Sequence, residues 1–141
     1  MGKIIAFDIG DKRVGVAYSD PLGIMALPAT TYWRKGFETD LENLAKIAKE
    51  QNAEKIVCGL PLNFDGSESE QTVKTREFIE GLKRHTDIPV DTADERFSTL
   101  QARRLLIEAD MRREKRKNVI DSVAASYILE DYLKKISVDK K

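Results

Sequence analysis

The first part of the chain alternates short apolar runs with polar turns. Residues 4–7 are apolar, Asp8 interrupts the run, and residues 14–18 resume it after a Gly-Asp-Lys-Arg turn. This pattern predicts a hairpin over about residues 3–19, and residues 25–33 are typical of a third strand that extends the meander. The acid inside the first strand is unusual, because burying a carboxylate costs several kcal/mol unless it is paired or ligates a metal ion.

Helical and strand-like patterns then alternate along the chain. Apolar residues recur at helical spacing over residues 37–51, and residues 55–60 form the continuous apolar run of a strand that is covered on both faces. Ser67, with a glutamate three residues later, is a capping box and predicts that a helix begins there and ends near residue 84. A further strand is expected over residues 88–93.

The last third of the chain is predicted to be helical on both sides of a basic linker. A second capping box opens a helix over about residues 98–110, and residues 112–117 form the linker. Asn118 is expected to cap a final helix over about residues 118–136, and residues 137–141 are expected to form a frayed tail.

The predicted order is three strands, a helix, a strand, a helix, a strand and two helices. A meander followed by alternating elements predicts an α/β fold in which a mixed five-stranded sheet is flanked by helices. This is the layout of the ribonuclease H-like fold. We expect one such domain over residues 1–136, because the chain shows neither an internal repeat nor a composition shift.

Composition limits the function classes. With 41% hydrophobic and 34% charged residues, the chain is typical of a soluble globular protein, and no apolar run approaches the roughly 20 residues of a membrane helix. Cys58 is the only cysteine, which excludes an intrachain disulfide and a thiolate-based zinc site. The start of the chain shows no targeting segment, so we expect a cytoplasmic protein. Because the net charge is zero, any nucleic-acid surface must arise from local clustering.

Three acids lie where acids are unfavourable. Asp8 interrupts the first strand, Glu95 follows the C-terminal end of a later strand, and Asp121 lies in the first turn of the predicted final helix. Asp121 precedes Ala125 and Ile128 at helical spacing, which places it on the stripe that should face the sheet. The predicted fold brings these three elements together.

Each acid also has an ordinary interpretation. Asp8 could be a turn residue beside a glycine, Glu95 could belong to a surface ion cluster, and Asp121 could simply stabilise the dipole at a helix N-terminus. Asp94 is an alternative to Glu95, and three further acids are weaker candidates: Asp11, Asp20 and Asp65.

Convergent acids repel one another, and divalent cations relieve that repulsion. Mg²⁺ prefers a few carboxylates together with water and phosphate oxygens. Two ions about 3.5–4 Å apart can hold the attacking water and the leaving oxygen of a phosphodiester in line. We therefore expect Asp8 to bridge two Mg²⁺ or Mn²⁺ ions, with Glu95 and Asp121 completing the site, in a phosphodiester-hydrolysing enzyme.

Four motifs in order resemble those of the YqgF family, the RuvC-like Holliday-junction resolvases that are also described as pre-16S rRNA nucleases. The motifs are FDIGDKRVGVA at 7–17, GLPLNFDGS at 59–67, DERFST at 94–99 and KRKNVIDSVAA at 115–125. The resemblance covers nearly the whole chain and implies a ribonuclease H-like fold with acids at Asp8, Glu95 and Asp121. Phe97 stands where leucine is more usual in the family, a change that should not affect the chemistry.

Basic residues adjoin the predicted site. From Arg103 to Lys117 there are seven basic and three acidic residues, an excess of +4 directly before Asp121. Phosphate contacts are expected from this segment and from the residues beside the other acids: Lys12, Arg13, Arg96, Arg113, Lys115, Arg116 and Lys117. The alternative is a solvated linker. Tyr32 and Trp33 are expected to pack within a strand rather than to stack on bases, and the loop 63–67 could bind phosphate or be a plain turn.

The leading hypothesis is a metal-dependent endonuclease that acts on structured nucleic acid, with precursor 16S rRNA preferred over four-way DNA because of the family resemblance. A resolvase would act as a homodimer, whereas a monomer suffices for rRNA trimming. The second hypothesis is an ATP-dependent phosphotransferase, a class of enzyme that also begins with a strand-Asp-x-Gly hairpin. Such an enzyme needs two domains of this kind to enclose the nucleotide, and this chain has room for one. A non-catalytic nucleic-acid-binding module that keeps the fold is the third possibility.

Overall fold

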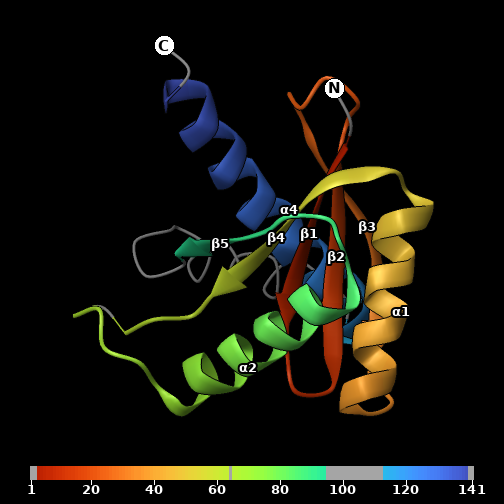
Figure 1. The fold of residues 1–141 in the computed structure, drawn as a ribbon, viewed down its shortest axis with the longest axis vertical. Helices are drawn as coiled ribbons and strands as arrows, with labels where there is room; N and C mark the ends of the chain where they lie inside the picture. Colours follow the sequence, from red (N-terminus) through yellow and green to blue (C-terminus); the bar gives the residue numbers. More distant parts are fainter. Residues whose placement is uncertain (1–2, 64, 95–112, 140–141) are drawn as a thin grey trace.

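The computed structural model describes residues 3–63, 65–94 and 113–139, and these form a sheet with helices on both sides (Figure 1). The five strands lie in the order β3-β2-β1-β4-β5, with β1 antiparallel to β2 and parallel to β4. The strands are β1 (Lys3–Ile9), β2 (Arg13–Ser19), β3 (Ala26–Trp33), β4 (Ala53–Leu60) and β5 (Val90–Asp94). The helices are α1 (Phe37–Glu50), α2 (Glu70–His85) and α4 (Arg113–Asp139). The predicted mixed five-stranded sheet is confirmed.

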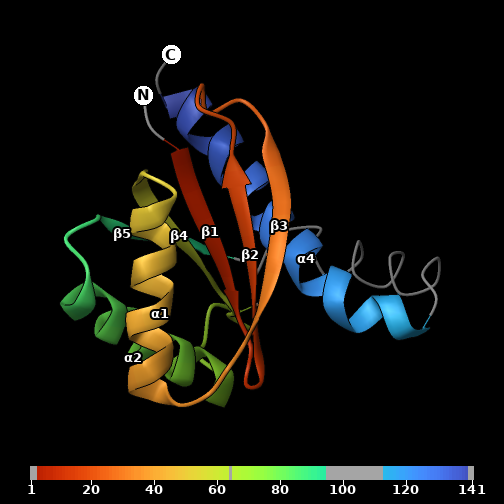
Figure 2. The same cartoon turned by 90° about the vertical axis from the view of Figure 1, so that its right-hand side faces the viewer.

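The alternation of side chains along β1 divides the core into two layers. Ile5, Phe7 and Ile9 point to the side that α1 and α2 cover, which we call the α1/α2 face. Ile4 and Ala6 point to the opposite side, the α4 face, against helix α4. Figure 2 shows α1 and α2 on one side of the sheet and α4 on the other. β1 is therefore covered on both sides.

Large side chains fill the α1/α2 face. Phe7, Leu41 and Phe78 are among the largest fully buried residues. At Gly81 of α2, an added Cβ would lie 2.6 Å from the Leu41 Cδ1 atom of α1. A larger residue at this position would require the Leu41 side chain to shift, because the two helices approach each other closely here.

The contact between α4 and the sheet combines alanines with larger apolar side chains. Ala6 and Ala17 on the strands lie in one buried cluster with Ala124 and Ala125 of the helix. The cluster is completed by larger residues: Ile4, Val57, Ile128, Leu129, Tyr132 and Leu133. The alanines let the helix lie close to β1 and β2.

Helix α4 begins earlier than the sequence predicts. It includes residues 113–117, which were expected to form a linker, and Asn118 lies inside the helix rather than at its N-cap. Lysine and arginine are good helix formers, so a basic stretch can continue a helix as readily as interrupt it. The helix also includes residues 137–139 of the expected tail. The helix predicted over 98–110 lies outside the described residues.

Helix α2 uses a different capping box from the predicted one. Ser69, not Ser67, is the N-cap: its Oγ accepts from the Thr72 N–H at 3.2 Å, and Thr72 Oγ1 accepts from the Ser69 N–H at 3.0 Å. Ser67 instead donates to Asp65 within the preceding loop. A threonine at the third helical position thus takes the role that the prediction gave to a glutamate.

Candidate active site

Asp8 lies in the central strand β1 on the α4 face of the sheet. Its neighbours Phe7 and Ile9 belong to the cluster on the α1/α2 face, so the alternation of the strand directs Asp8 to the opposite side. Asp8 is partly buried within a strand that is otherwise buried from Ile4 to Ile9. The predicted placement of an acid in the first strand is therefore confirmed, with the carboxylate still partly exposed.

Glycines flank Asp8 on both neighbouring strands. Asp8 pairs with Gly15 of β2, and the pairing of Phe7 with Cys58 places Gly59 beside it on β4. Both glycines are buried in regular strands, so their backbone conformation does not require glycine. What the two positions provide is the absence of a side chain. No side chain of Gly15 or Gly59 therefore lies beside the Asp8 carboxylate.

Asp121 lies in α4, and the early start of this helix changes its context. Because α4 begins at Arg113, Asp121 lies in the third turn rather than in the first. A favourable interaction with the helix dipole, which falls off within the first turn, no longer accounts for an acid there. Its position along the helix coincides with the stripe of Ala125 and Ile128 that packs on the sheet.

The structure separates Asp94 from Asp8. Asp94 pairs with Leu60, which belongs to the cluster on the α1/α2 face, and the preceding Ala93 packs on the α4 face. Paired residues of parallel strands point to the same side, so Asp94 lies on the face opposite Asp8. Glu95 and Arg96 lie outside the described residues.

The predicted metal ligands are tested only in part. Among the side chains that the structure describes, no three His, Cys, Asp or Glu residues lie close enough to hold a metal ion. Glu95 and the side chain of Asp121 are not among them, so the complete ligand set stays a prediction. Asp8 itself fits a hard cation, because it offers carboxylate oxygens between two positions without side chains.

The basic residues predicted to contact phosphate are placed unevenly. Lys12 is exposed in the β1–β2 turn. Arg13 lies on the α4 face, and its guanidinium carbon is 5.4 Å from the centre of the Trp33 ring. The side chains of Arg113, Lys115, Arg116 and Lys117 lie outside the described residues, although their backbone forms the first turns of α4.

Two aromatic residues of β3 differ from each other. Tyr32 packs against the buried cluster on the α1/α2 face, as predicted. Trp33 was also expected to pack, but 50% of it is exposed. Its pairing with Arg13 places it on the face that carries Asp8. The strand pattern predicts this face, but the sequence alone does not show that β3 is an edge strand.

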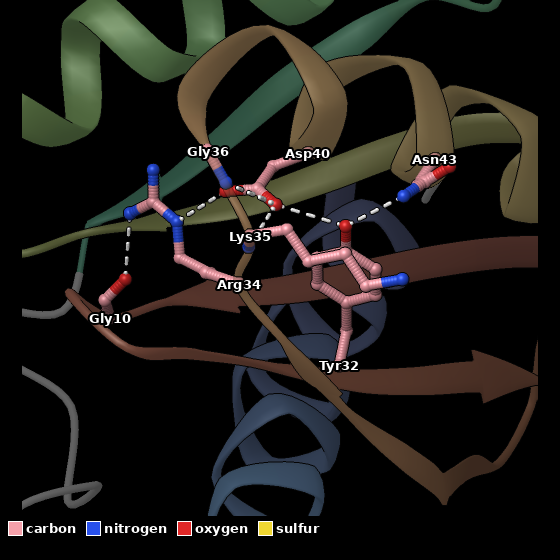
Figure 3. Close-up of polar contacts among 7 residues, drawn as sticks. All are labelled: Gly10, Tyr32, Arg34, Lys35, Gly36, Asp40 and Asn43. Carbon is pink, nitrogen blue, oxygen red and sulfur yellow. Dashed lines mark hydrogen bonds and ion pairs between the residues drawn. The ribbon is translucent and has the colours of Figure 1, made fainter.

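A buried ion pair on the other face holds the hairpin that carries Asp8. Figure 3 shows Asp40 of α1 accepting from the Arg34 Nε at 2.9 Å, from the Tyr32 hydroxyl at 2.9 Å and from the Lys35 N–H at 2.8 Å. Arg34 also donates to the Gly10 carbonyl in the β1–β2 turn at 2.9 Å. This cluster, which we call the Asp40 network, joins the start of α1 and the end of β3 to the turn after Asp8.

The Asp40 carboxylate is completely buried and remains charged. Burial would raise its pKa, but the hydrogen bonds from the Lys35 N–H, from Arg34 and from Tyr32 outweigh burial and lower the pKa below the usual value of an aspartate. The sequence does not reveal this role, because an acid in the first turn of a helix is common for electrostatic reasons alone.

The loop 63–67 is closed by its own hydrogen bonds. The Asp65 carboxylate accepts from the Ser67 N–H at 2.9 Å, and Asn63 donates to the Ser67 hydroxyl at 3.0 Å. The first turn of α2 is capped by Ser69. These contacts favour the plain-turn interpretation over a phosphate site.

Comparisons with known proteins agree with this arrangement. The RuvX family model, described as Holliday junction resolvase, matches residues 2–135. A protein of Halothermothrix orenii (strain H 168) is 48% identical over 131 residues, which cover 93% of this chain and 94% of its own. A protein of Clostridium novyi (strain NT) is 44% identical over 134 residues, which cover 95% of this chain and 99% of its own. Both carry the name "Putative pre-16S rRNA nuclease".

A solved structure shows the same fold at low sequence identity. T. thermophilus RuvC, determined in complex with a Holliday junction substrate, superposes with a TM-score of 0.58 at 9% identity, over 91% of this chain and 92% of RuvC. The likeness confirms the predicted ribonuclease H-like fold. Because the family model covers nearly all of the sequence, the chain belongs to the RuvX Holliday junction resolvase family.

Proposed function

We propose that this protein is a metal-dependent endonuclease that hydrolyses phosphodiester bonds of structured nucleic acid, and that its substrate is the 5′ region of precursor 16S rRNA. The observation that carries the proposal is the position of Asp8: a carboxylate in the central strand, between Gly15 and Gly59, on the face against which α4 packs. The choice of substrate follows the name of relatives that are 44% and 48% identical.

The acids Asp8, Glu95 and Asp121 would hold the cation, Mg²⁺ or Mn²⁺, and two ions would complete the site. Bound divalent ions supply the positive charge that activates water and stabilises the leaving oxygen of a phosphodiester. The carboxylates of the chain fix where that charge lies relative to the sheet. The Asp40 network holds the β1–β2 turn in place, which limits the movement of Asp8.

The positive residues around the site would position the substrate. Lys12 and Arg13 lie four and five residues after Asp8 in the same hairpin, and the basic first turns of α4 lead toward Asp121. Contacts to phosphate fix the register of a nucleic acid without reading its sequence. Specificity for one substrate would then depend on its shape. Cleavage of ribosomal RNA precursors implies action in the cytoplasm, and within the described residues no helix is long and apolar enough to cross a membrane.

The second candidate function is the resolution of four-way DNA junctions. The description of the family model and the shared fold with RuvC favour it. This activity cuts two strands, so it would need two active sites and hence a homodimer. Processing of rRNA requires only a monomer.

Parallel cleavage assays test the proposal and separate the two substrates. A precursor 16S 5′ fragment and a synthetic four-way junction are incubated with the wild-type chain, Asp8→Asn and Asp94→Asn, in Mg²⁺ or Mn²⁺ and in EDTA. We expect metal-dependent cleavage of the rRNA fragment, its loss in Asp8→Asn and its retention in Asp94→Asn, because Asp94 lies on the opposite face.

The possible results separate the candidate functions. Preferred cleavage of the junction would replace the substrate assignment and keep the nuclease. Full cleavage by Asp8→Asn would overturn the assignment of the site. Binding that persists in EDTA, with no metal-dependent cleavage of either substrate, would favour a non-catalytic module.

A further inference from the structure

Trp33 is a large aromatic residue that the fold leaves half exposed. It is the last residue of β3, the edge strand of the sheet, and 50% of it is open to solvent. Single exposed apolar residues are common on protein surfaces and need no explanation by themselves. Two further observations distinguish Trp33: the face on which it lies and the charges around it.

The strand pairing places Trp33 on the same face as Asp8. Asp8 pairs with Gly15, Gly15 pairs with Thr31, and Trp33 follows Thr31 by two residues along β3. Neighbouring strands lie about 4.8 Å apart, and the chain rises about 3.4 Å per residue along a strand. Trp33 lies two strands across and two residues along from Asp8, so the two Cα atoms are roughly 12 Å apart. A few nucleotides of a strand span this distance, because successive phosphates lie about 3.4 Å apart along a duplex axis.

A positive charge lies against the Trp33 ring. The Arg13 guanidinium lies 5.4 Å from the ring centre, a cation–π contact that orients the indole. Two exposed lysines, Lys12 and Lys35, lie in the adjoining segments, which the hydrogen bond from the Arg34 N–H to the Lys12 carbonyl joins at 2.9 Å. Two other exposed apolar residues lie in or near β3, Leu27 near the start of the strand and Phe37 at the start of α1, where its ring contacts Phe78. Others lie beyond the opposite end of β3, in the loop with Asp20: Leu22, Ile24 and Met25.

An aromatic ring among cations is the arrangement by which proteins bind unpaired nucleotides. Every base has a π face, so stacking on an indole is tolerant of sequence, while the cations contact the backbone. A base inside a duplex is already stacked on its neighbours and cannot make this contact. The arrangement therefore selects for unpaired nucleotides.

We propose that Trp33, backed by Arg13, is a stacking platform for an unpaired base of the nucleic acid that lies across Asp8. This inference rests on the proposed nuclease function and specifies its substrate class: a strand with at least one unpaired nucleotide within a few positions of the cleaved phosphate. Arg13 and Trp33 act in binding the substrate and do not take part in the chemistry.

Tryptophan fluorescence tests this platform directly, because Trp33 is the only tryptophan in the chain. The full chain carrying Asp8→Asn, which prevents cleavage, is titrated with single-stranded RNA, single-stranded DNA and a blunt duplex of equal length. Anisotropy of a dye on the oligonucleotide measures binding, and indole emission measures stacking. We expect quenching on binding of either single strand and none on binding of the duplex.

Variants quantify the contribution of stacking. Trp33→Leu should weaken single-strand binding by about 5-fold to 150-fold, the range for the loss of one stacked base. Trp33→Phe should recover part of that loss. In both variants, duplex binding should differ from that of the parent by less than about 2-fold. Leu22→Ala, an exposed apolar residue beyond the other end of β3, is the matched control and should bind as the parent does.

The outcomes keep the two proposals distinct. Bound single strands without quenching, or equal weakening of single-strand and duplex binding in Trp33→Leu, would overturn the platform while the nuclease assignment stands. Quenching by single strands, with no metal-dependent cleavage of any substrate by the wild-type chain, would remove the nuclease assignment and leave the platform. The quenching experiment uses the native tryptophan, so it decides the question even if Trp33→Leu fails to fold.

Discussion

The two faces of the sheet each carry an acid, but they surround it differently. On the α1/α2 face, Asp40 is fully buried, and donors from Tyr32, Arg34 and Lys35 contact its oxygens. On the α4 face, Asp8 is partly exposed between Gly15 and Gly59, and the nearby helix contact includes alanines of both the helix and the strands. Donors of the chain hold the first acid, and residues without side chains flank the second.

The difference separates stability from chemistry. An acid whose partners all come from the chain contributes to folding, because its charge is compensated by fixed hydrogen bonds. An acid beside positions without side chains is suited to a ligand. We therefore expect substitutions on the α1/α2 face to change the free energy of unfolding, and substitutions around Asp8 to change cleavage.

The largest stability effect is expected for Asp40→Asn. The change leaves the Arg34 guanidinium, only 20% exposed, without its ion-pair partner, and should lower the free energy of unfolding by about 3 kcal/mol. Urea denaturation measures the loss. Glu42→Gln on the exposed side of α1 is the control and should change stability by less than about 0.5 kcal/mol. Equal stability of the two variants would contradict a structural role for Asp40.

The contribution of Asp40 should depend on pH. Because the pKa of the folded group is lowered, its stabilisation is fully present above the ordinary aspartate pKa of about 3.9 and is lost as pH falls through the lower folded-state value. The stability difference between wild type and Asp40→Asn should thus be constant above about pH 5 and shrink below about pH 4. A difference that grows on acidification would be incompatible with a lowered pKa.

A side chain at Gly15 should impair cleavage. Opposite residues of an antiparallel pair have Cβ atoms about 4.5–5.5 Å apart, so Gly15→Val fills space beside the Asp8 carboxylate. We expect cleavage per folded molecule to fall about 100-fold, and Gly15→Ala to have a smaller effect. Thr30→Val introduces the same side chain at an exposed β3 position beside Val16 and should cleave normally. Wild-type rates for Gly15→Val would show that the space is not needed.

A smaller effect is expected where α4 is anchored to the sheet. The Tyr132 hydroxyl accepts from the Lys55 Nζ at 3.0 Å and donates to the Asp91 carboxylate at 2.7 Å. Tyr132→Phe should lower the free energy of unfolding by about 1 kcal/mol and change cleavage by less than about 3-fold. Lys134→Gln breaks only an exposed pair with Glu130 and should have no measurable effect on stability. A large loss of cleavage in Tyr132→Phe would show that this anchor also sets the position of Asp121.

The sequence predicts the strands and the mixed five-stranded sheet well, because strand alternation and helical spacing are local patterns. It also predicts Asp8 within the first strand, which the structure confirms, whereas the direction of the Asp121 side chain stays a prediction. It misses the start of α4, because basic residues suit a helix as well as a linker.

Features that depend on long-range pairing escape local patterns. The Asp40 network joins residues from the β1–β2 turn, β3 and α1, and no local signal links them. The exposure of Trp33 depends on which end of β3 the helix α4 covers, since the cluster under α4 includes Ala26 at the other end of the strand and not Trp33. Asp94 and Glu95 are adjacent in sequence, and the β4–β5 pairing is what assigns Asp94 to the face away from Asp8.

The most direct test of the division between the two faces measures cleavage rate and unfolding free energy together, in Asp8→Asn and in Asp40→Asn. The account predicts that Asp8→Asn loses at least about 10³-fold in rate, because bound metal supplies several kcal/mol to the transition state, while its stability stays within about 1 kcal/mol of wild type. Asp40→Asn should lose stability and keep its rate per folded molecule. An Asp8→Asn variant that cleaves within 10-fold of wild type, or an Asp40→Asn variant that is stable but inactive, would contradict it.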